Sequence, residues 1–437
     1  MTPPLLPSLM SRRLPVFYGW IVLACVCCAG FARQGPAVAT LSIFVEPLTR
    51  EFGWSRTALS GAVSLGGLLA ALVAPWIGPM LDRHGSRLVL CAAVLVNGVA
   101  LMVLSLTRSL LVFYLLFCAA RMNWAAPFDL GIYGALNNWF VRRRAFASSL
   151  GTLAQQIGLV AMPLIAQLAM LQHGWRAGWL AIGAVTLVVG FVPTWLLMVR
   201  RPEDLGLTPD GVVLPIPGEV GASGASGASP EPAFSRRQAL GTASFWLLLL
   251  YTALVFPVQS GVSLHQAPYL IECGIAPVIA ATIVSTFSAL SAVATLACAA
   301  LPRAMPIRYP LAATGAILAL GVVLMLGIRS AAQGYLAASV FGFGIGALLT
   351  LLPIAWADYF GRANFGAIRG LALSAQVLAQ AAGPLLSGVL RDMTGNYRLA
   401  LQSFAVLAVL SVAAALGARQ PWVPGDRLRR PTGAEAG

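Results

Sequence analysis

Residues 78–87 read GPMLDRHGSR, a short polar stretch between two long apolar stretches. At an offset of 221 residues (Arg87 to Arg308), residues 299–308 read AALPRAMPIR and also separate two apolar stretches. The same offset aligns Pro36 with Pro257, Pro47 with Pro268, Gly53 with Gly274, Gln155 with Gln376, and Pro163 with Pro384. One offset that holds over the whole chain indicates two tandem copies of one unit.

The composition is that of a membrane protein. Of the 437 residues, 59% are hydrophobic and 10% are charged, and the mean hydropathy is +0.83. These values exclude a soluble globular domain. A bilayer core about 30 Å thick needs roughly 20 apolar residues per helix. Stretches of that kind predict transmembrane helices near residues 16–45, 56–80, 88–106, 110–138, 145–170, 177–199, 241–267, 277–300, 309–328, 332–357, 369–390 and 399–418.

The repeat and the apolar stretches together predict an all-α membrane protein. We expect twelve transmembrane helices in two six-helix bundles related by pseudo-two-fold symmetry, as in many secondary transporters. Residues 1–199 would form the N-terminal bundle, 200–240 a cytoplasmic linker, and 241–437 the C-terminal bundle with a cytoplasmic tail. The glycine, alanine and serine run at 221–229 predicts a flexible part of that linker.

The basic residues predict the orientation. All 28 are arginine, because the chain contains no lysine. Most of them, including Arg142 and Arg369, fall at span ends on the same side as the termini, so the positive-inside rule predicts cytoplasmic termini in a cell inner membrane. The net charge of +14 follows from this topology, since a nucleic-acid surface needs arginines gathered on one soluble face. Arg12 and Arg13 before an apolar run resemble a signal peptide, but the repeat favours a first span.

The opening stretch resembles a known signature. Its residues Gly78, Asp82, Arg83, Gly85 and Arg87 fit the G-x-x-x-D-R-x-G-x-R pattern of the major facilitator superfamily. Glycines allow a short cytoplasmic turn, and an acid there can face the positive N-terminal end of a helix from the other bundle. We therefore expect Asp82 to act as a latch that stabilises an outward-open state. The alternative is a plain polar turn.

Four further stretches resemble bacterial members of the monocarboxylate and oxalate/formate antiporter branch of that superfamily. They are 18–20 (YGW), 173–176 (HGWR), 201–206 (RPEDLG) and 360–366 (FGRANFG). The resemblance implies a carrier of small organic anions, mostly carboxylates, that works by alternating access with a coupled proton or counter-anion. The chain departs from the branch because the position after Pro36, a lysine in the resembling carriers, is Ala37. Residues 283–300 and 371–390 also carry no charge, so another cation must bind the anion.

Arg33 and Arg121 are the candidate replacements, because each lies about halfway along its predicted span. An arginine at mid-bilayer costs roughly 2.5 to 3.5 kcal/mol on insertion scales, so each should face a polar cavity and have a partner. Pro36 loosens the helix beside Arg33, and a guanidinium can hold a carboxylate through two hydrogen bonds. The alternatives are that Arg33 snorkels outward and that Arg121 pairs structurally with Asp129.

Asp129 is the acid that the sequence places well inside a span, two turns after Arg121. A buried carboxyl beside an arginine suits a proton relay, and a structural counter-ion is the alternative. His265 is a second candidate for proton coupling, with a structural hydrogen bond as its alternative. The residues aligned with Arg33, Arg121 and Asp129 in the second copy are Leu254, Gly342 and Thr350. We therefore expect the charged groups to be confined to one half.

Uncharged residues complete the predicted substrate site. Gln155 and Gln376 occupy aligned positions, and we expect them to line the pore or to join helices by hydrogen bonds. Phe343, in a glycine-rich span, is expected to shape an apolar gate. The seven cysteines show no ligand-like or bridging arrangement, and no nucleophile elbow or phosphate loop is present. The sequence therefore predicts neither an enzyme nor a metal site or cofactor.

The function expected from these features is secondary active transport of a small organic anion, such as a monocarboxylate, by a monomer in the lipid bilayer. The main alternative within transport is a carrier of a neutral or cationic compound, as in efflux. A membrane receptor or scaffold that does not transport is a further alternative, which would be favoured if Arg33 and Arg121 faced lipid.

Overall fold

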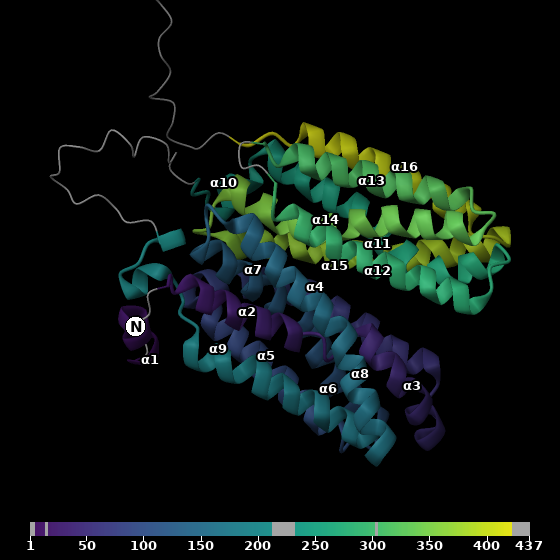
Figure 1. Cartoon of the computed structure of the whole chain (residues 1–437), viewed down its shortest axis with the longest axis horizontal. Coiled ribbons are helices and arrows are strands. Elements are labelled where there is room, and N and C mark those ends of the chain that lie inside the picture. The colour runs from purple at the N-terminus through teal and green to yellow at the C-terminus, as the bar shows by residue number, and fades with distance from the viewer. Residues whose placement is uncertain (1–4, 14–15, 212–231, 302–304, 422–437) are drawn as a thin grey trace, which may run out of the picture.

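The computed structural model describes residues 5–13, 16–211, 232–301 and 305–421 (Figure 1). Within these ranges the regular structure is helical throughout, with no strand. The first part contains α1 (Leu5–Arg13), α2 (Gly19–Ala32), α3 (Val38–Phe52), α4 (Arg56–His84), α5 (Ser86–Leu104), α6 (Leu110–Ala125), α7 (Pro127–Trp139), α8 (Arg144–Val185), η1 (Thr186–Phe191), α9 (Val192–Leu197), η2 (Pro202–Leu205) and η3 (Pro209–Gly211). The second contains α10 (Arg236–Leu240), α11 (Ala243–Glu272), α12 (Pro277–Cys298), α13 (Arg308–Leu326), α14 (Ala331–Phe360), α15 (Phe365–Thr394) and α16 (Arg398–Gly417). The predicted flexible run at 221–229 and the residues of the tail from 422 on lie outside the described residues.

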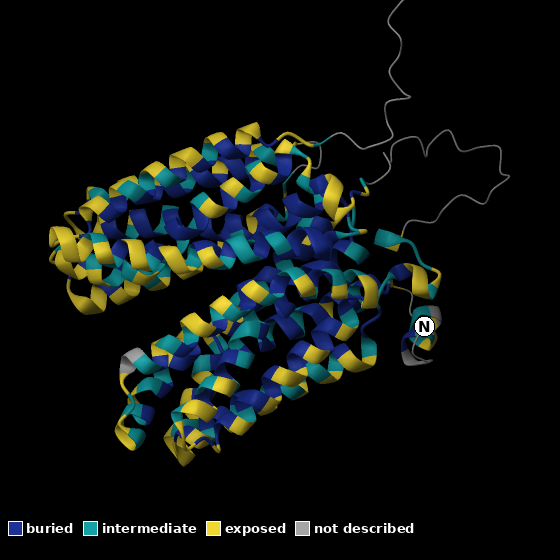
Figure 2. Ribbon diagram, turned by 180° about the vertical axis from the view of Figure 1, so that it is seen from behind, coloured by how far each residue is buried: buried dark blue, intermediate teal, exposed yellow. Residues whose placement is uncertain are grey.

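Ten helical stretches in the described ranges are long and apolar enough to cross a bilayer, and Gly19–Ala32 is a shorter apolar helix. The protein is therefore a multi-pass membrane protein. Its outer surface carries large apolar side chains such as Trp76, Leu111 and Val278, which are at least 70% exposed. Figure 2 shows exposed residues on the outward faces of the helices and buried residues between them. Such a surface suits contact with lipid tails better than contact with water.

The helices gather in two groups, which are α2 to α9 and α11 to α16 (Figure 1). The groups lie close together at one end of the molecule, where α10 is found, and we call this the linker end. They diverge toward the opposite end, where α3 lies, and we call this the α3 end. Helix α4 of the first group packs along α15 of the second.

Glycines allow α4 and α15 to approach closely. A Cβ atom at Gly78 of α4 would collide with the carbonyl oxygen of Gly366 in α15. A Cβ atom at Gly370 would lie only 2.6 Å from the carbonyl oxygen of Ala74. The two helix backbones are therefore in direct contact near the linker end, at a distance that larger side chains would not permit.

The first predicted span is broken in its middle. Helix α2 ends at Ala32 and α3 begins at Val38, with turns between them. Pro36 explains the break because it has no N–H to continue the helical hydrogen bonds. Arg33 is the C-cap residue of α2, where a positive charge is favourable beside the negative end of the helix.

The fourth predicted span, 110–138, corresponds to one long apolar stretch, Leu110–Trp139, whose helix is interrupted at Ala126. Helix α6 ends at Ala125, and α7 begins at Pro127. Proline is favoured at the first position of a helix because the missing N–H has no helical partner there in any case. Asp129 consequently lies in the first turn of α7, where an acid is stabilised by the positive end of the helix.

A third irregularity separates the predicted fifth and sixth spans. Helix α8 leaves helical geometry at His173 and Gly174. Gly174 has a φ of 77°, in the left-handed region that glycine adopts most readily. The chain therefore changes direction between 145–170 and 177–199, as the sequence predicts.

The start of the predicted linker packs against both groups at the linker end. The Asp210 carboxylate accepts hydrogen bonds from three successive backbone N–H groups, those of Val141 at 2.9 Å, Arg142 at 2.5 Å and Arg143 at 3.0 Å. Glu203 forms an ion pair of 2.7 Å with Arg362, in the loop between α14 and α15. The described part of this segment is therefore docked by specific polar contacts.

Candidate functional site

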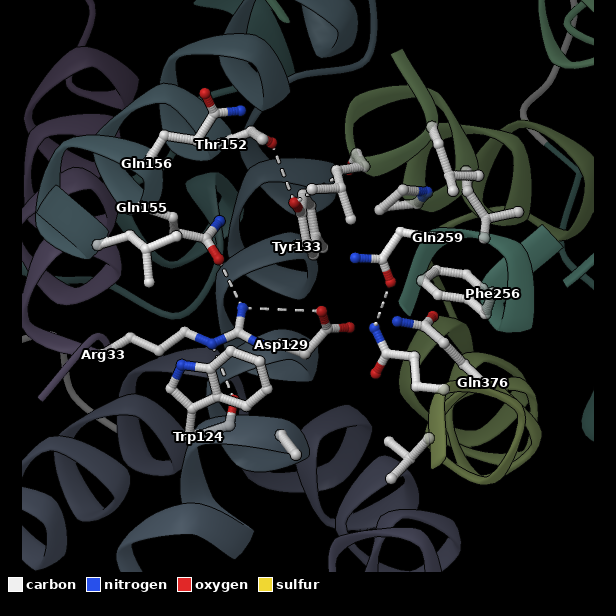
Figure 3. Close-up of a pocket in the computed structure, with 18 of the residues that line it drawn as sticks. Arg33, Trp124, Asp129, Tyr133, Thr152, Gln155, Gln156, Phe256, Gln259 and Gln376 are labelled. Atoms are coloured by element: carbon white, nitrogen blue, oxygen red, sulfur yellow. Dashed lines mark hydrogen bonds and ion pairs between the residues drawn. The ribbon is translucent and has the colours of Figure 1, made fainter. Parts of the chain in front are cut away.

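A cavity of about 260 Å³ lies between the two groups of helices. Both groups contribute to it, with the first group on one side and the second facing it (Figure 3). The polar side chains that line it, together with Trp124, are Arg33, Gln34, Asp129, Tyr133, Thr152, Gln155, Gln156, Gln259, Arg369, Gln376 and Gln380. A lining with this many polar groups is unusual between apolar helices, which marks the cavity as the candidate binding site.

Arg33 lines the cavity from the break in the first predicted span. Its Nε donates to the backbone carbonyl of Trp124 at 2.8 Å, beside the break between α6 and α7. Its Nη1 donates to Oε1 of Gln155 at 2.5 Å, and its Cζ lies 4.6 Å from the centre of the Trp124 ring. The side chain is only 8% exposed, so it does not snorkel outward. The two broken helices thus hold a cation at the cavity wall.

Asp129 lies between two arginines. Its Oδ1 is 3.8 Å from Nη1 of Arg33, and its Oδ2 is 3.3 Å from Nη2 of Arg369 (Figure 3 shows the first of these pairs). These two partners come from different helix groups, because Arg33 follows α2 and Arg369 belongs to α15. A buried carboxylate needs such partners, since an isolated charge away from water is strongly unfavourable. Asp129 therefore links the two groups at the level of the cavity.

Arg369 is the cavity residue that the sequence analysis misplaced. The sequence predicts a place at a cytoplasmic span end, but the side chain of Arg369 is 2% exposed and lines the cavity. Its Nη2 also donates to Oε1 of Gln376 at 2.7 Å. The expectation that charged groups are confined to one half is consequently wrong. A spacing of seven residues, two helical turns, puts Arg369 and Gln376 on one face of α15, which is the signal that the sequence did contain.

Arg369 also retains unused hydrogen-bonding capacity. Its Nε and Nη1 are buried and have no hydrogen-bond partner among the described residues. Buried donors without a partner are rare in folded proteins and indicate a ligand or water that completes them. Arg369 is part of the cavity lining, and a guanidinium is the kind of group that binds a carboxylate best.

Gln155 and Gln376, which the repeat aligns, both line the cavity, and each accepts a hydrogen bond from one of its arginines. Gln259 of α11 and Gln380 of α15 belong to the second group, as Gln376 does, and Gln380 donates to Gln259 at 3.3 Å. Tyr133 contributes a hydroxyl that lies 3.0 Å from Oγ1 of Thr152. The cavity thus combines two cations and one acid with several neutral groups that donate and accept hydrogen bonds.

Arg121 and Phe343 do not line this cavity. Arg121 lies against the ring of Trp124, with Cζ 3.9 Å from the ring centre, and its Nε and Nη1 are buried without a hydrogen-bond partner among the described residues. It does not pair with Asp129, whose ion-pair partners in the described chain are Arg33 and Arg369.

Phe343 lies on α14 and is half-buried. Trp124, which carries both Arg33 and Arg121 on its ring, was not singled out from the sequence.

His265 lies apart from Asp129. It lines a separate and much smaller cavity in the second group, together with Tyr269 and Tyr397. Its Nδ1 is 3.1 Å from the hydroxyl of Tyr397. Burial, and then the nearby Glu272 carboxylate, raise the pKa of Tyr397, so this phenol stays protonated and can donate to His265. These contacts fit the structural alternative that the sequence analysis left open.

The residues of the opening stretch meet α15 at the linker end. Oδ1 of Asp82 accepts from the backbone N–H of Gly366 at 2.8 Å, and Oδ2 accepts from that of Ala367 at 2.7 Å. Both donors belong to the first turn of α15, so the acid caps a helix of the other group. The side chain of Arg83 is exposed.

The remaining residues of that stretch shape the turn between α4 and α5. Gly85 has a φ of 86°, which suits glycine, and a Cβ atom there would collide with the side chain of Arg200. Arg87 donates to the backbone carbonyl of Trp195 at 2.8 Å. These contacts join the turn to α9 and to the start of the linker. An ion pair between Arg144 of α8 and Asp358 of α14 further joins the two groups near this end.

No cluster of three or more metal-ligating side chains is found among the described residues. The seven cysteines are all unpaired. The chemistry of the cavity is therefore that of arginine, aspartate and amide groups, which bind and orient a ligand without a metal ligand set from the described chain.

A polar, charged cavity between groups of membrane-crossing helices is typical of a membrane carrier. Residues 20–347 match the family described as the Major Facilitator Superfamily, and the chain belongs to this superfamily. It is accordingly a transporter-family protein and not an enzyme.

Relatives and solved structures agree with this assignment. Human (Homo sapiens) monocarboxylate transporter 11 is 28% identical over 404 residues, which cover 87% of this chain and 78% of the relative. Rat (Rattus norvegicus) monocarboxylate transporter 3 is 26% identical over 398 residues, which cover 87% and 76%. The crystal structure of the human organic anion transporter MFSD10 (TETRAN) superposes with a TM-score of 0.68 at 15% identity, covering 92% of this chain and 100% of that one. The last similarity shows the fold alone.

Proposed function

We propose that this protein is a secondary active transporter of a small organic anion, in particular a monocarboxylate. The observation that carries the proposal is the pair of buried arginines, Arg33 and Arg369, which line one cavity and share a single carboxylate, Asp129. A cavity wall with more cations than anions attracts an anionic ligand. The names of the relatives, monocarboxylate transporters 11 and 3, support the same class of substrate.

The proposed architecture is twelve transmembrane helices in two six-helix bundles related by pseudo-two-fold symmetry. Ten apolar stretches of the described chain are long enough to span. The broken pair of α2 and α3 provides one more span, and the stretch Arg144–Leu197 divides at Gly174 into two. The bundles are residues 1–199 and 241–437, with the linker 200–240 between them. We propose a monomer in the cell inner membrane, with the linker end and both termini in the cytoplasm.

Alternating access follows from this architecture. The two groups are joined at the linker end by Asp82 with α15 and by Arg144 with Asp358, and they diverge toward the α3 end. With the linker end in the cytoplasm, this arrangement is an outward-facing state. Breaking the linker-end contacts would allow the bundles to rock about the cavity and open it to the other side. Asp82, assisted by the glycines and arginines of its stretch, is the proposed latch.

The coupled species is a proton or a counter-anion. Asp129 is the proposed proton relay, because a proton on its carboxyl would weaken its attraction to both arginines and release the link between the groups. In anion exchange, the second anion would occupy the same arginines during the return step. Both modes use one cavity and the same two cations.

The test is uptake of radiolabelled carboxylates by the purified protein in liposomes, with either an inward proton gradient or an internal counter-anion. The expected result is monocarboxylate uptake that one of these gradients drives and that Arg33→Gln or Arg369→Gln abolishes. Arg176→Gln is the matched control, because Arg176 is exposed and pairs with Glu51 outside the cavity lining. Transport of neutral or cationic compounds with no uptake of carboxylates would overturn the proposal.

A further inference from the structure

The charged side chains that line the central cavity, within the described chain, are Arg33, Asp129 and Arg369. Each arginine is close to the same carboxylate, at 3.8 Å and 3.3 Å, and each also donates a side-chain hydrogen bond to a neutral glutamine, Gln155 or Gln376. One negative charge is thus shared between two positive charges. The side chains of the cavity wall therefore carry one uncompensated positive charge.

The two arginines differ in the hydrogen bonds that they already make. Nε and Nη1 of Arg369 have no hydrogen-bond partner in the described part of the chain, whereas Arg33 already donates from Nε to Trp124 and from Nη1 to Gln155. Arg121 adds positive charge on the ring of Trp124, but it does not line the cavity and does not contact Asp129. Its positive charge attracts any anion in the cavity without touching it.

We propose that Asp129 sets the charge of the substrate, so that the cavity accepts monoanions and discriminates against dianions. This inference rests on the proposed function, because it concerns the anion that the same cavity binds. While Asp129 is ionised, as it is when it pairs with both arginines, one carboxylate neutralises the excess positive charge of the wall. A dianion would place its second charge beside Asp129, and the described cavity lining has no third cation in contact to compensate it. An uncompensated charge away from water is strongly unfavourable. Without Asp129, the two arginines would match a dianion instead.

If Asp129 sets the charge of the substrate, the preference for monoanions or dianions should follow the net charge of the cavity wall. A purely structural role for Asp129 would not produce this dependence. Asp129→Asn leaves two cations at the wall and should favour dianions. Arg33→Gln alone leaves no net positive charge at the wall. The double substitution Asp129→Asn with Arg33→Gln leaves one cation, Arg369, so it should restore the preference for monoanions even though both side chains have changed. Asp129→Glu keeps the charge and should keep the wild-type preference.

The experiment compares uptake of labelled monomethyl succinate and labelled succinate, and of the corresponding malonate pair, at pH 7.5 in liposomes. Each pair has nearly one shape but differs by one charge. Wild type should prefer the half-ester by at least about tenfold, a conservative figure for one unit charge about 4 Å from the bound anion. Asp129→Asn should lower that preference by at least about tenfold, and the double variant should regain it. Asp392→Asn is the matched control, because its carboxylate is exposed and lies outside the cavity lining.

The outcomes separate this inference from the proposed function. If wild type takes up neither member of either pair, the anion-transport proposal fails together with the inference. If wild type takes up half-esters and Asp129→Asn keeps the wild-type preference, only the role of Asp129 is overturned. If Asp129→Asn does not fold, the double variant decides, because a folded double variant that takes up succinate as well as the half-ester would contradict the charge balance.

Discussion

Replacing Asp82 by asparagine should shift the transporter away from the conformation described here. The Asp82 carboxylate uses both oxygens to accept backbone hydrogen bonds at the N-terminus of α15, at 2.8 and 2.7 Å. Asparagine keeps one acceptor oxygen and loses the charge. A hydrogen bond to a charged group contributes about 1.5 to 3 kcal/mol, and each 1.4 kcal/mol changes an equilibrium constant tenfold. The population ratio of the two conformations should therefore change by roughly 10- to 150-fold.

Spin labels at the α3 end can measure this change. Leu171 of α8 and Val278 of α12 belong to different groups and are 73% and 77% exposed, so cysteines there should tolerate a label in a background without the native cysteines. Pulsed electron resonance should give a shorter distance in Asp82→Asn than in wild type, because the α3 end closes when the linker end opens. An unchanged distance distribution would refute the latch. Glu203→Gln tests whether loss of an exposed acid at the same end has the same effect.

Three further predictions concern contacts within the fold. Gly78→Val should give the same shortened distance between the spin labels as Asp82→Asn, because its Cβ would collide with the carbonyl of Gly366. Gly67→Ala should behave as wild type, because the nearest atom to its Cβ would be a side-chain carbon of Val377 at 3.9 Å. Equal behaviour of both variants would contradict the close contact of α4 and α15. Trp179→Ala should lower the midpoint temperature of unfolding in detergent, because it removes a fully buried ring stacked 3.9 Å from the ring of Phe44. The expected loss in free energy of unfolding is about 3 to 5 kcal/mol. An unchanged midpoint would show that Trp179 does not pack in this core. Asp210→Asn should speed hydrogen exchange of the backbone amides at 141–143, and wild-type protection there would show that the docking contributes nothing.

Periodicity and composition predicted the parts of the structure that depend on local signals. Long apolar stretches predicted membrane-crossing helices, and Pro36 marked the loosened helix beside Arg33, where the chain is indeed broken. The alignment of Gln155 with Gln376 pointed to two residues that share one cavity. The predictions of the helices and of the break at Pro36 succeeded because the local residue types determine helix length and helix breaks, whatever the tertiary structure.

The residues that sequence analysis missed depend on contacts between distant segments. Arg369 was assigned to a span end because arginines there usually mark topology, and only the packing of α15 against α4 and α7 buries it beside Asp129. Arg121 is also an arginine and lies nearer the middle of its predicted span, yet it packs against the ring of Trp124 and does not line the cavity. Which of two arginines reaches a cavity is decided by helix rotation and packing. A single sequence does not determine these directly.

The most direct test of the account is binding of a transported monocarboxylate to the purified protein, measured by calorimetry for wild type, Arg33→Gln, Arg369→Gln and the double variant. Each single substitution removes charge-assisted hydrogen bonds worth about 1.5 to 3 kcal/mol, so affinity should fall roughly 10- to 150-fold, and the double variant should not bind. Arg176→Gln, outside the cavity lining, should bind as wild type. Wild-type affinity in the double variant, with its fold retained, would contradict the claim that these two arginines form the anion site.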